Sequence, residues 1–366
     1  MTRRTGAAAK LPGLSGATDT AAAPPGTEKH LKIPERPRAL GESQNPQETS
    51  ALQKANVWVG PAGWSYADWR GIVYPSHPSG SGKELETIAQ NFDTVEINTS
   101  FYRPPRPEVV RVWLRKSSIN PRFRFTAKLY RRFTHERDAS ADEEREFKDG
   151  IAPLIEAGKL GALLVQFPWS FKNAPENRQY LAGLLLRFHD YPLVVEVRHA
   201  SWVPGMPTAA ATKRDQRAPV SKPSVLDLLE EYGAGFCNLD QPVIGRSLPP
   251  TENVTAPVGY VRLHGRNYES WFAESGGVDL RYDYLYSREE LAEWKRRIDA
   301  VAARSRDTYV ILNNHFQGKA VANAVQLRSM IEGRLVPVPP LLAARYPQLE
   351  EVAATPAEPE DVFRLT

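Results

Sequence analysis

Residues 260–267, which read YVRLHGRN, carry two chemically capable side chains at a spacing typical of a strand. Side chains on a strand alternate between its faces, so Arg262 and His264 share one face while Val261 and Leu263 share the other. A guanidinium binds carboxylate or phosphate oxygens two at a time, and an imidazole transfers protons near neutral pH. The stretch therefore predicts a site that holds an anion and moves a proton.

Further polar residues fall at or just beyond the ends of other predicted strands. Glu96 and Glu196 are the candidate acids or bases, and His264 completes the set of predicted catalytic residues. We expect Asp240 to point inward with them. The predicted ligand-binding residues are Asn98, Tyr102, Lys128, His135, Gln166, Arg198, Asp240, Arg262, Arg266, Asn313 and Asn314.

These residue types leave several kinds of site open. Carboxylates and a histidine are ligands for Zn²⁺ or Mn²⁺ in barrel hydrolases and isomerases, where a bound water becomes the nucleophile. Equal numbers of inward acids and bases would instead form an ion-pair network that needs no ligand. A third possibility is that Glu96 and Glu196 flank a sugar as acid and base. Aromatic residues suited to stacking on such a ligand are Trp64, Tyr66, Tyr102, Trp202, Tyr268 and Trp271.

An anionic ligand is the interpretation that we favour. Several arginines lie at or just beyond predicted strand ends: Arg103, Arg131, Arg132, Arg198, Arg262 and Arg266. Gly318 and Lys319 also begin a predicted helix after the last strand, where barrels often hold a phosphate on backbone N–H groups. A Gly-Lys pair is equally compatible with an ordinary helix start.

Eight short β-rich segments alternate with amphipathic, helix-like segments along the chain. The predicted strands are residues 57–60, 94–98, 123–128, 162–167, 193–198, 235–240, 260–264 and 309–314. This alternation predicts an α/β fold, a (β/α)8 TIM-type barrel whose sites lie at the C-terminal ends of its strands. A doubly wound sheet competes, but Gly60-Pro-Ala-Gly-Trp lacks the spacing of a phosphate-binding glycine motif.

Composition divides the chain into three parts. We expect a disordered, low-complexity extension over residues 1–55, a single barrel domain over 56–335, and a Pro/Ala/Glu-rich segment over 336–366. Residues 203–223 are predicted to be a flexible insertion at the barrel mouth.

Charge and cysteine content bear on partners and compartment. The net charge is only +4, yet residues 102–137 are strongly basic and the acidic stretch at 138–149 could simply neutralise them. A single cysteine, Cys237, excludes an internal disulfide, and no apolar segment is long enough to span a bilayer. We expect a cytoplasmic protein that does not bind membranes.

Several motifs in order resemble those of the YecE-like family of domains of unknown function. They are Gly63-Trp-Ser-Tyr with Asp68-Trp-Arg-Gly, residues 92–103, Thr134-His135, Leu164-Val-Gln-Phe-Pro, residues 195–202, residues 260–267, Tyr282-Asp-Tyr-Leu-Tyr, and Asn313-Asn314 with Ala320 and Asn323-Ala. The resemblance covers about residues 57–332 and implies a TIM-type barrel, but it brings no biochemical activity with it. The extension, the insertion after Trp202 and the Pro-rich end depart from the family pattern.

The functional hypothesis is a barrel that binds a small phosphate-bearing or otherwise anionic ligand at its mouth and hydrolyses it. Arg262 and Arg198 would hold the anion, His264 would transfer a proton, and Glu96 or Glu196 would act as base. No cofactor is expected, and nucleic acid is one source of the phosphate. The alternatives are a divalent-metal-dependent phosphoesterase or isomerase, and a non-catalytic polyanion-binding or regulatory protein.

Overall fold

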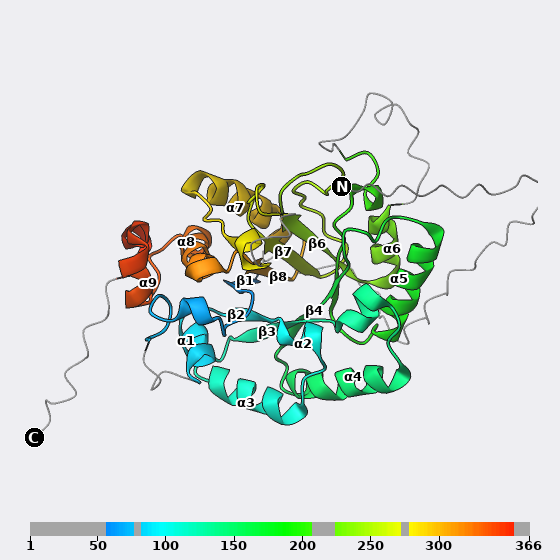
Figure 1. Cartoon of the computed structure of the whole chain (residues 1–366), viewed down its shortest axis with the longest axis horizontal. Coiled ribbons are helices and arrows are strands. Elements are labelled where there is room, and N and C mark those ends of the chain that lie inside the picture. The colour runs from blue at the N-terminus through cyan, green and yellow to red at the C-terminus, as the bar shows by residue number, and fades with distance from the viewer. Residues whose placement is uncertain (1–55, 77–81, 207–223, 272–277, 355–366) are drawn as a thin grey trace, which may run out of the picture. The chain divides into compact units, whose positions relative to one another are not determined.

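The computed structural model describes residues 56–76, 82–206, 224–271 and 278–354. Eight parallel strands form the centre of this region (Figure 1). They are β1 (Asn56–Pro61), β2 (Thr94–Ile97), β3 (Arg124–Lys128), β4 (Leu160–Gln166), β5 (Leu193–Glu196), β6 (Gly235–Asp240), β7 (Val258–Leu263) and β8 (Asp307–Leu312). Each predicted strand is therefore present, within a few residues of its expected bounds.

The sheet curls into a nearly closed barrel. The strand order is β1-β8-β7-β6-β5-β4-β3-β2, and every neighbouring pair is parallel. The two ends of this order, β1 and β2, approach each other. The backbone N–H of Gly63, just after β1, donates to the carbonyl of Glu96 in β2 at 2.9 Å. A Cβ atom on Gly60 would collide with the carbonyl oxygen of Thr94, so glycine is what allows β1 and β2 to approach there.

Helices surround the strands, as Figure 1 shows. They are α1 (Glu84–Asn91), α2 (Thr99–Tyr102), α3 (Pro107–Ser117), α4 (Ala141–Glu156), α5 (Pro175–Arg187), α6 (Val225–Tyr232), α7 (Arg288–Ala302), α8 (Lys319–Glu332) and α9 (Pro340–Arg345). Residues 241–257, which join β6 to β7, contain no helix. The predicted (β/α)8 TIM-type fold is confirmed, with that one helix missing.

Local sequence signals account for several helix ends. Ser140 and Glu143 form a capping box at the start of α4, and Ser287 and Glu290 form the same arrangement at α7. Helix α6 ends at Gly233, whose left-handed backbone (φ 66°) suits a residue without a Cβ atom. These signals are local in the sequence and need no tertiary contact.

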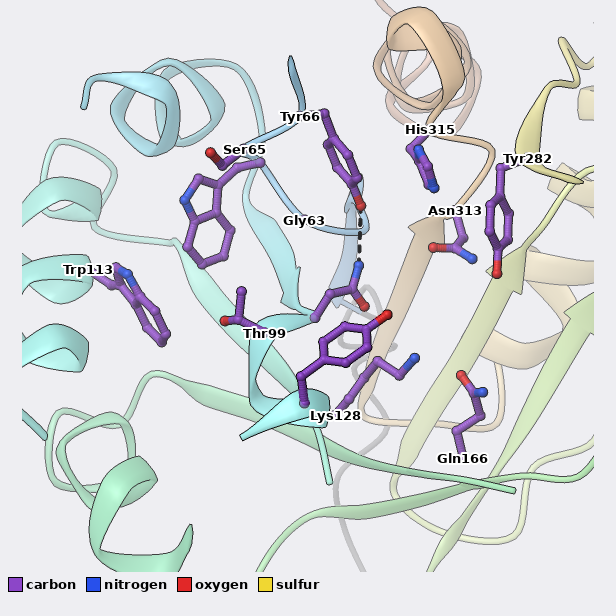
Figure 2. A pocket seen from close by; sticks show the side chains of 13 residues that line it. Gly63, Ser65, Tyr66, Thr99, Trp113, Lys128, Gln166, Tyr282, Asn313 and His315 are labelled. Carbon is purple, nitrogen blue, oxygen red and sulfur yellow. Dashed lines mark hydrogen bonds between the residues drawn. The ribbon is translucent and has the colours of Figure 1, made fainter. Parts of the chain in front are cut away.

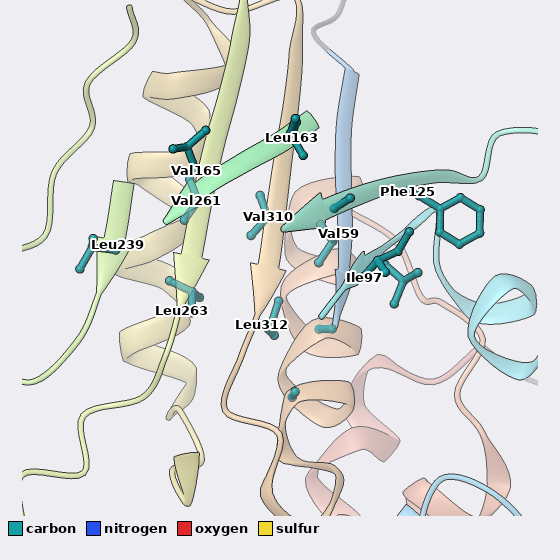
Figure 3. Packing of buried hydrophobic residues seen from close by; sticks show 14 of the residues in the cluster. Val59, Ile97, Phe125, Leu163, Val165, Leu239, Val261, Leu263, Val310 and Leu312 are labelled. Carbon is teal, nitrogen blue, oxygen red and sulfur yellow. The ribbon is translucent and has the colours of Figure 1, made fainter. Parts of the chain in front are cut away.

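Two apolar layers lie on opposite faces of the strands. Aliphatic residues such as Val261, Leu263 and Val310 face the helices (Figure 3). Inside the barrel, Trp58 stacks on Tyr309 at 5.2 Å between ring centroids, within a second apolar cluster. Most residues of this cluster come from the first halves of the strands, so it fills the N-terminal end and the middle of the barrel. The polar residues of the central network therefore lie toward the C-terminal mouth.

The segment after α8 packs against the barrel. The side chains of Val336, Leu342 and Leu349 are fully buried, and the Tyr346 hydroxyl donates to the carbonyl of Gln317 at 2.7 Å. Residues 336–354 therefore behave as part of the folded domain. The predicted extension (1–55), most of the predicted insertion (207–223) and the chain end (355–366) lie outside the described residues.

None of the described helices combines the length and the apolar composition that crossing a bilayer requires.

Candidate functional site

The guanidinium of Arg262 is the centre of a buried polar network inside the barrel mouth. Its Nη2 donates to Glu96 Oε1 at 2.8 Å and its Nη1 donates to Glu196 Oε2 at 2.5 Å. Nη1 also donates to Gln166 Oε1 at 3.1 Å, and the Tyr260 hydroxyl donates to Glu96 Oε2 at 3.0 Å. The Arg262 side chain is only 1% exposed. Strands β2, β4, β5 and β7 thus meet at one arginine.

Glu196 is held by two guanidinium groups. Besides Arg262, Arg198 donates to Glu196 Oε1 from Nη2 at 2.7 Å and from Nε at 2.8 Å. Burial by itself raises the pKa of Glu196, but the charges of Arg262 and Arg198 outweigh it and hold the pKa well below its usual range. Glu196 therefore stays ionised near neutral pH and is a poor proton acceptor.

The two glutamates do not face an open space. Glu96 and Glu196 bind different nitrogens of the same guanidinium, so Arg262 occupies the position between their carboxylates. An acid and a base that flank a glycosidic bond need room for the sugar between them. The predicted alternative of a sugar held between these two carboxylates therefore conflicts with the geometry.

His264 is fully buried beside the same arginines. Its Nδ1 lies 2.9 Å from Asn313 Nδ2, and its Nε2 lies 3.3 Å from Arg198 Nη2 and 3.4 Å from Arg262 Nη1. Burial, followed by the charges of Arg198 and Arg262, lowers the pKa of His264 to about 3. The imidazole is thus neutral at physiological pH and does not cycle readily through its charged form.

A cavity of about 500 Å³ opens at the C-terminal mouth above this network. Figure 2 shows Tyr282, Asn313 and His315 on one side of the cavity and Trp113 on the other. Its lining residues are Gly63, Trp64, Ser65, Tyr66, Asn98, Thr99, Tyr102, Trp113, Lys128, Gln166, Tyr282, Asn313 and His315. Asn98, Lys128, Gln166 and Asn313 were predicted from strand ends, and Tyr102 was predicted as an aromatic residue that could stack on a ligand.

Lys128 supplies a cation to this cavity. Its Nζ lies 4.5 Å from the centre of the Phe101 ring. Within the described parts of the chain, no carboxylate lies at ion-pair distance from it. Burial, followed by the nearby charge of Arg262, lowers the pKa of Lys128 to about 8. Lys128 is therefore mostly protonated at pH 7 without a carboxylate to balance it.

His135 contacts the same Phe101 ring as Lys128. Its ring packs edge to face with Phe101 at 4.9 Å, and its Nδ1 lies 2.9 Å from Thr134 Oγ1. It belongs to a short π-helical turn, Arg132–Glu136, which ends at Arg137 in a left-handed conformation (φ 62°). Burial and the neighbouring charge of Lys128 lower the pKa of His135 to about 4. A second neutral imidazole thus borders the site.

The formal charges of the mouth do not cancel. Lys128, Arg198 and Arg262 contribute three positive charges, and Glu96 and Glu196 contribute two negative ones, a formal balance of 3 − 2 = +1. Neutral His264 and His135 add nothing near pH 7. The excess positive charge lies beside a cavity, where it can act on a ligand.

Residues 58–345 match the family model described as Protein of unknown function DUF72. The chain belongs to the DUF72 family. The family contains the UPF0759 proteins YunF and YecE, so the resemblance found in the sequence motifs is confirmed.

Two relatives of this DUF72 protein are UPF0759 proteins. UPF0759 protein YunF of Bacillus subtilis (strain 168) is 28% identical over 291 residues, which cover 75% of this chain and 95% of YunF. UPF0759 protein YecE of Escherichia coli (strain K12) is 29% identical over 147 residues, 39% of this chain and 48% of YecE.

Solved structures of DUF72 proteins show the same barrel. A family protein of Thermotoga maritima MSB8 has a TM-score of 0.64 and 34% identity, covering 76% of this chain and 99% of that one. One from Enterococcus faecalis V583 has a TM-score of 0.61 and 27% identity, covering 75% and 95%.

Asp240 does not belong to the central network of this DUF72 barrel. It pairs in register with Leu263, whose side chain faces the helices, and in-register residues of parallel strands share a face. Its carboxylate accepts from Arg266 Nε at 2.9 Å, and Arg266 also pairs with Glu290 of α7 at 3.1 Å. The predicted inward position of Asp240 is wrong, and Arg266 accompanies it outside the cavity.

Asn314 and the start of α8 have structural partners. Asn314 is fully buried and donates from Nδ2 to the carbonyl of Tyr284 at 2.8 Å and to Asn323 Oδ1 at 2.9 Å. The N–H of Gln317 donates to Asp68, and Lys319 pairs with Asp283. The carboxylates of Asp68 and Asp283 thus contact the start of α8, where the sequence suggested a phosphate.

The acids and histidines of the described chain segments do not gather in groups of three or more that could hold a metal ion. The potential donors Glu96 and Glu196 are bound by arginines, and Asp240 lies on the other face of the sheet. His264 Nε2 does lie 3.6 Å from Glu196 Oε1, but the predicted metal ligands do not converge as a set of three.

Several cavity residues were missed by reasoning from strand ends. Trp113 comes from α3, and Tyr282 comes from the segment before α7. Of the aromatic residues expected to stack on a ligand, Trp64, Tyr66 and Tyr102 line the cavity, whereas Trp202 is buried and donates to the carbonyl of Phe171 at 2.7 Å. The repeated tyrosines of residues 282–286 were the available signal for Tyr282.

Proposed function

We propose that this DUF72 protein binds a small anionic ligand, of the phosphate-bearing type, in the cavity at the barrel mouth. The observation that carries the proposal is Lys128, a cavity-lining ammonium with no carboxylate at ion-pair distance among the described residues. A charge held partly out of water is costly without a partner, and an anion in the cavity would supply one.

The cavity walls favour a ligand that also carries a ring. Trp64, Tyr66, Trp113 and Tyr282 line the space together with the amides of Asn98 and Gln166. Aromatic faces bind flat or sugar-like surfaces, and amides fix their polar edges. A phosphorylated sugar or a mononucleotide combines these features with a negative charge.

Arg262 and Glu196 act as a scaffold in this proposal. The terminal nitrogens of buried Arg262 are bound by Glu96, Glu196 and Gln166, so Arg262 sets the local field instead of gripping the ligand. The pKa of Glu196 is well below neutral, and that of His264 is about 3. Both groups are poorly suited to the proton transfers that the hydrolytic hypothesis assigns to them, so the proposal is one of binding.

A polyanion-binding role has weaker support because much of the basic segment is paired locally. Arg131 pairs with Glu136 at 2.8 Å, and Arg132 pairs with Asp138 at 3.0 Å and Glu143 at 3.3 Å. These carboxylates neutralise the arginines that would otherwise contact the negative charges of a polyanion. A cytoplasmic location stays part of the proposal, and the single cysteine fits it.

A thermal-shift panel tests the binding proposal. The probes are inorganic phosphate, uridine 5′-monophosphate and pyridoxine 5′-phosphate, each ring compound beside its unphosphorylated parent. Ligands that bind only the native state raise its melting temperature. We expect the phosphorylated compounds to raise it more than their parents, and Lys128→Met to abolish the difference.

Lys172→Met is the matched control, because Lys172 is an exposed lysine whose ammonium lies 5.4 Å from the Trp169 ring. It should respond like the wild-type protein. The proposal would be overturned in favour of metal binding if no phosphate compound raised the melting temperature but Mn²⁺ or Zn²⁺ did. In that case a chelator should remove the effect of the metal.

A further inference from the structure

Lys128 differs from the ion-paired lysines of the described chain in what surrounds its amine. Lys148, Lys295 and Lys319 each pair with a carboxylate, namely Glu144, Asp299 and Asp283. An adjacent carboxylate stabilises the ammonium form, which has no lone pair to offer. Among the described residues, the contact of the Lys128 amine is with the Phe101 ring, and the side chain lines a cavity large enough for a small molecule.

The backbone fixes where this amine lies. The carbonyl of Lys128 accepts a hydrogen bond from Ser100 Oγ at 2.7 Å, which ties the end of β3 to α2. Phe101, the next residue of α2, lies under the side chain with Nζ 4.5 Å from its ring centre. Figure 2 shows the Lys128 side chain among the residues that line the cavity, with Gln166 nearby. The amine is thus presented from a rigid strand end.

We propose that Lys128 is a nucleophile that forms an imine with a carbonyl compound bearing an anionic group. This inference rests on the proposed function, because the same cavity takes the ligand. Its chemical class is an aldehyde or ketone with a phosphate or carboxylate on the same small molecule.

The step balances without another reactant. The Nζ lone pair attacks the carbonyl carbon, a C–N bond forms, and a proton passes from nitrogen to oxygen to give a carbinolamine. Loss of that oxygen as water leaves the C=N bond. A protonated imine carries one positive charge, so the charge that attracts the anion is retained after the bond forms.

The surroundings support both stages of this reaction. Gln166 uses its Oε1 to accept from Arg262, which leaves its Nε2 amide as a donor for the carbonyl oxygen. The nearby charge of Arg262 and burial keep the pKa of Lys128 at about 8, so about half of the amine is neutral at pH 8. An ordinary exposed lysine is almost wholly protonated there.

The test uses pyridoxal 5′-phosphate at one equivalent with the full chain, followed by borohydride reduction and peptide mapping. Pyridoxine 5′-phosphate, which has the same ring and phosphate but no aldehyde, reports binding alone. We expect the reduced adduct at Lys128, with a formation rate that rises with pH to an inflection near pH 8. Added pyridoxine 5′-phosphate should slow adduct formation by competition.

Variants give the complementary measurement. Lys128→Arg retains a cation and should bind pyridoxine 5′-phosphate while losing the adduct, whereas Lys172→Arg should keep both. Peptide mapping of the wild-type chain shows whether the adduct forms at Lys128, even if the Lys128 variant does not fold.

The outcomes separate the two proposals. Binding of pyridoxine 5′-phosphate with an adduct spread over exposed lysines would overturn the imine and keep anion binding. An adduct confined to Lys128 without competition by pyridoxine 5′-phosphate would keep the nucleophile and remove the anion site. Neither binding nor adduct would overturn both.

Discussion

Arg262 Nη1 lies 2.5 Å from Glu196 Oε2, and the same guanidinium reaches Glu96 Oε1 at 2.8 Å through Nη2. Three buried charged groups from strands β2, β5 and β7 are therefore joined through the guanidinium of Arg262. Such networks stabilise a fold little compared with apolar packing, but removing one member leaves the others uncompensated. Their place at the barrel mouth ties the stability of the domain to the geometry of the cavity.

Removing the central cation should be severely destabilising. Arg262→Met leaves Glu96 and Glu196 buried without that guanidinium, and we expect a loss of about 3–5 kcal/mol in the free energy of unfolding. Urea denaturation followed by circular dichroism measures it. Arg288→Met removes an exposed pair with Glu351 and should cost at most about 1 kcal/mol. Equal losses in the two variants would contradict the network's role.

Acid should weaken the fold through His264. Its pKa is about 3 when folded and near 6.5 when unfolded, so between these values the unfolded state binds a proton that the folded state does not. Stability should therefore fall as pH drops below 6.5, by up to about 1.4 kcal/mol per pH unit from this residue. Urea unfolding at pH 7.5, 6.5, 5.5 and 4.5 (about unit steps) gives the slope.

Two histidine variants isolate that contribution. His264→Gln should have a shallower pH dependence of stability than the wild-type protein. His189→Gln should match the wild type, because His189 is exposed and lies beside Asp190 on the surface. An unchanged slope in His264→Gln would show that this imidazole does not titrate on unfolding as described.

The aromatic wall should contribute to binding of the ring and not of the phosphate. Tyr282→Ala removes one face of the cavity, and we expect about 5- to 10-fold weaker binding of uridine 5′-monophosphate. The affinity for inorganic phosphate should be unchanged. Isothermal titration calorimetry measures both. A similar loss for both ligands would indicate that Tyr282 shapes the cavity as a whole instead of stacking on a ring.

The C-terminal segment should contribute directly to domain stability. Leu342 is fully buried, whereas its neighbour Leu341 is 39% exposed. We expect Leu342→Ala to lower the free energy of unfolding by about 2–5 kcal/mol and Leu341→Ala to change it by less than about 0.5 kcal/mol. Chemical denaturation of both variants is the measurement, and equal values would show that the segment is not packed as described.

Two glycines should respond in opposite directions to alanine. In Gly60→Ala the new methyl group meets the Thr94 carbonyl where β1 approaches β2, and we expect a loss of about 1–3 kcal/mol. Gly183 lies inside α5 with no atom near its absent Cβ, so Gly183→Ala should gain about 0.5–1 kcal/mol. Melting temperatures of the two variants provide the comparison, and a stable Gly60→Ala would contradict the tight closure.

Much of the barrel could be predicted because its signals are local. The eight strands and their helices appear as runs with period two or 3.6, and capping residues such as Ser140 and Glu143 mark helix starts. The shared face of Arg262 and His264 follows from alternation along one strand. Strand ends also pointed to Lys128, Asn98 and Gln166, which do line the cavity.

Asp240 shows where local patterns fail. Strand β6 is buried on both faces, so its apolar residues do not reveal which side is inward. Only the register with β7, in which Asp240 pairs with Leu263, places its carboxylate toward α7 and Arg266. Trp113 is a comparable case, because a tryptophan on a helix carries no local sign that it borders a cavity.

The sequence by itself determined the class of fold, the end of the barrel that bears the polar residues, and the family to which the chain belongs. Tertiary structure decided which charges neutralise one another. Arg262 binds Glu96 and Glu196, which are 166 and 66 residues away in the chain, and Lys128 lies beside the cavity with no carboxylate of the described segments at ion-pair distance. Pairing of charges depends on distance in space, which strand order and register set, and no local spacing encodes it.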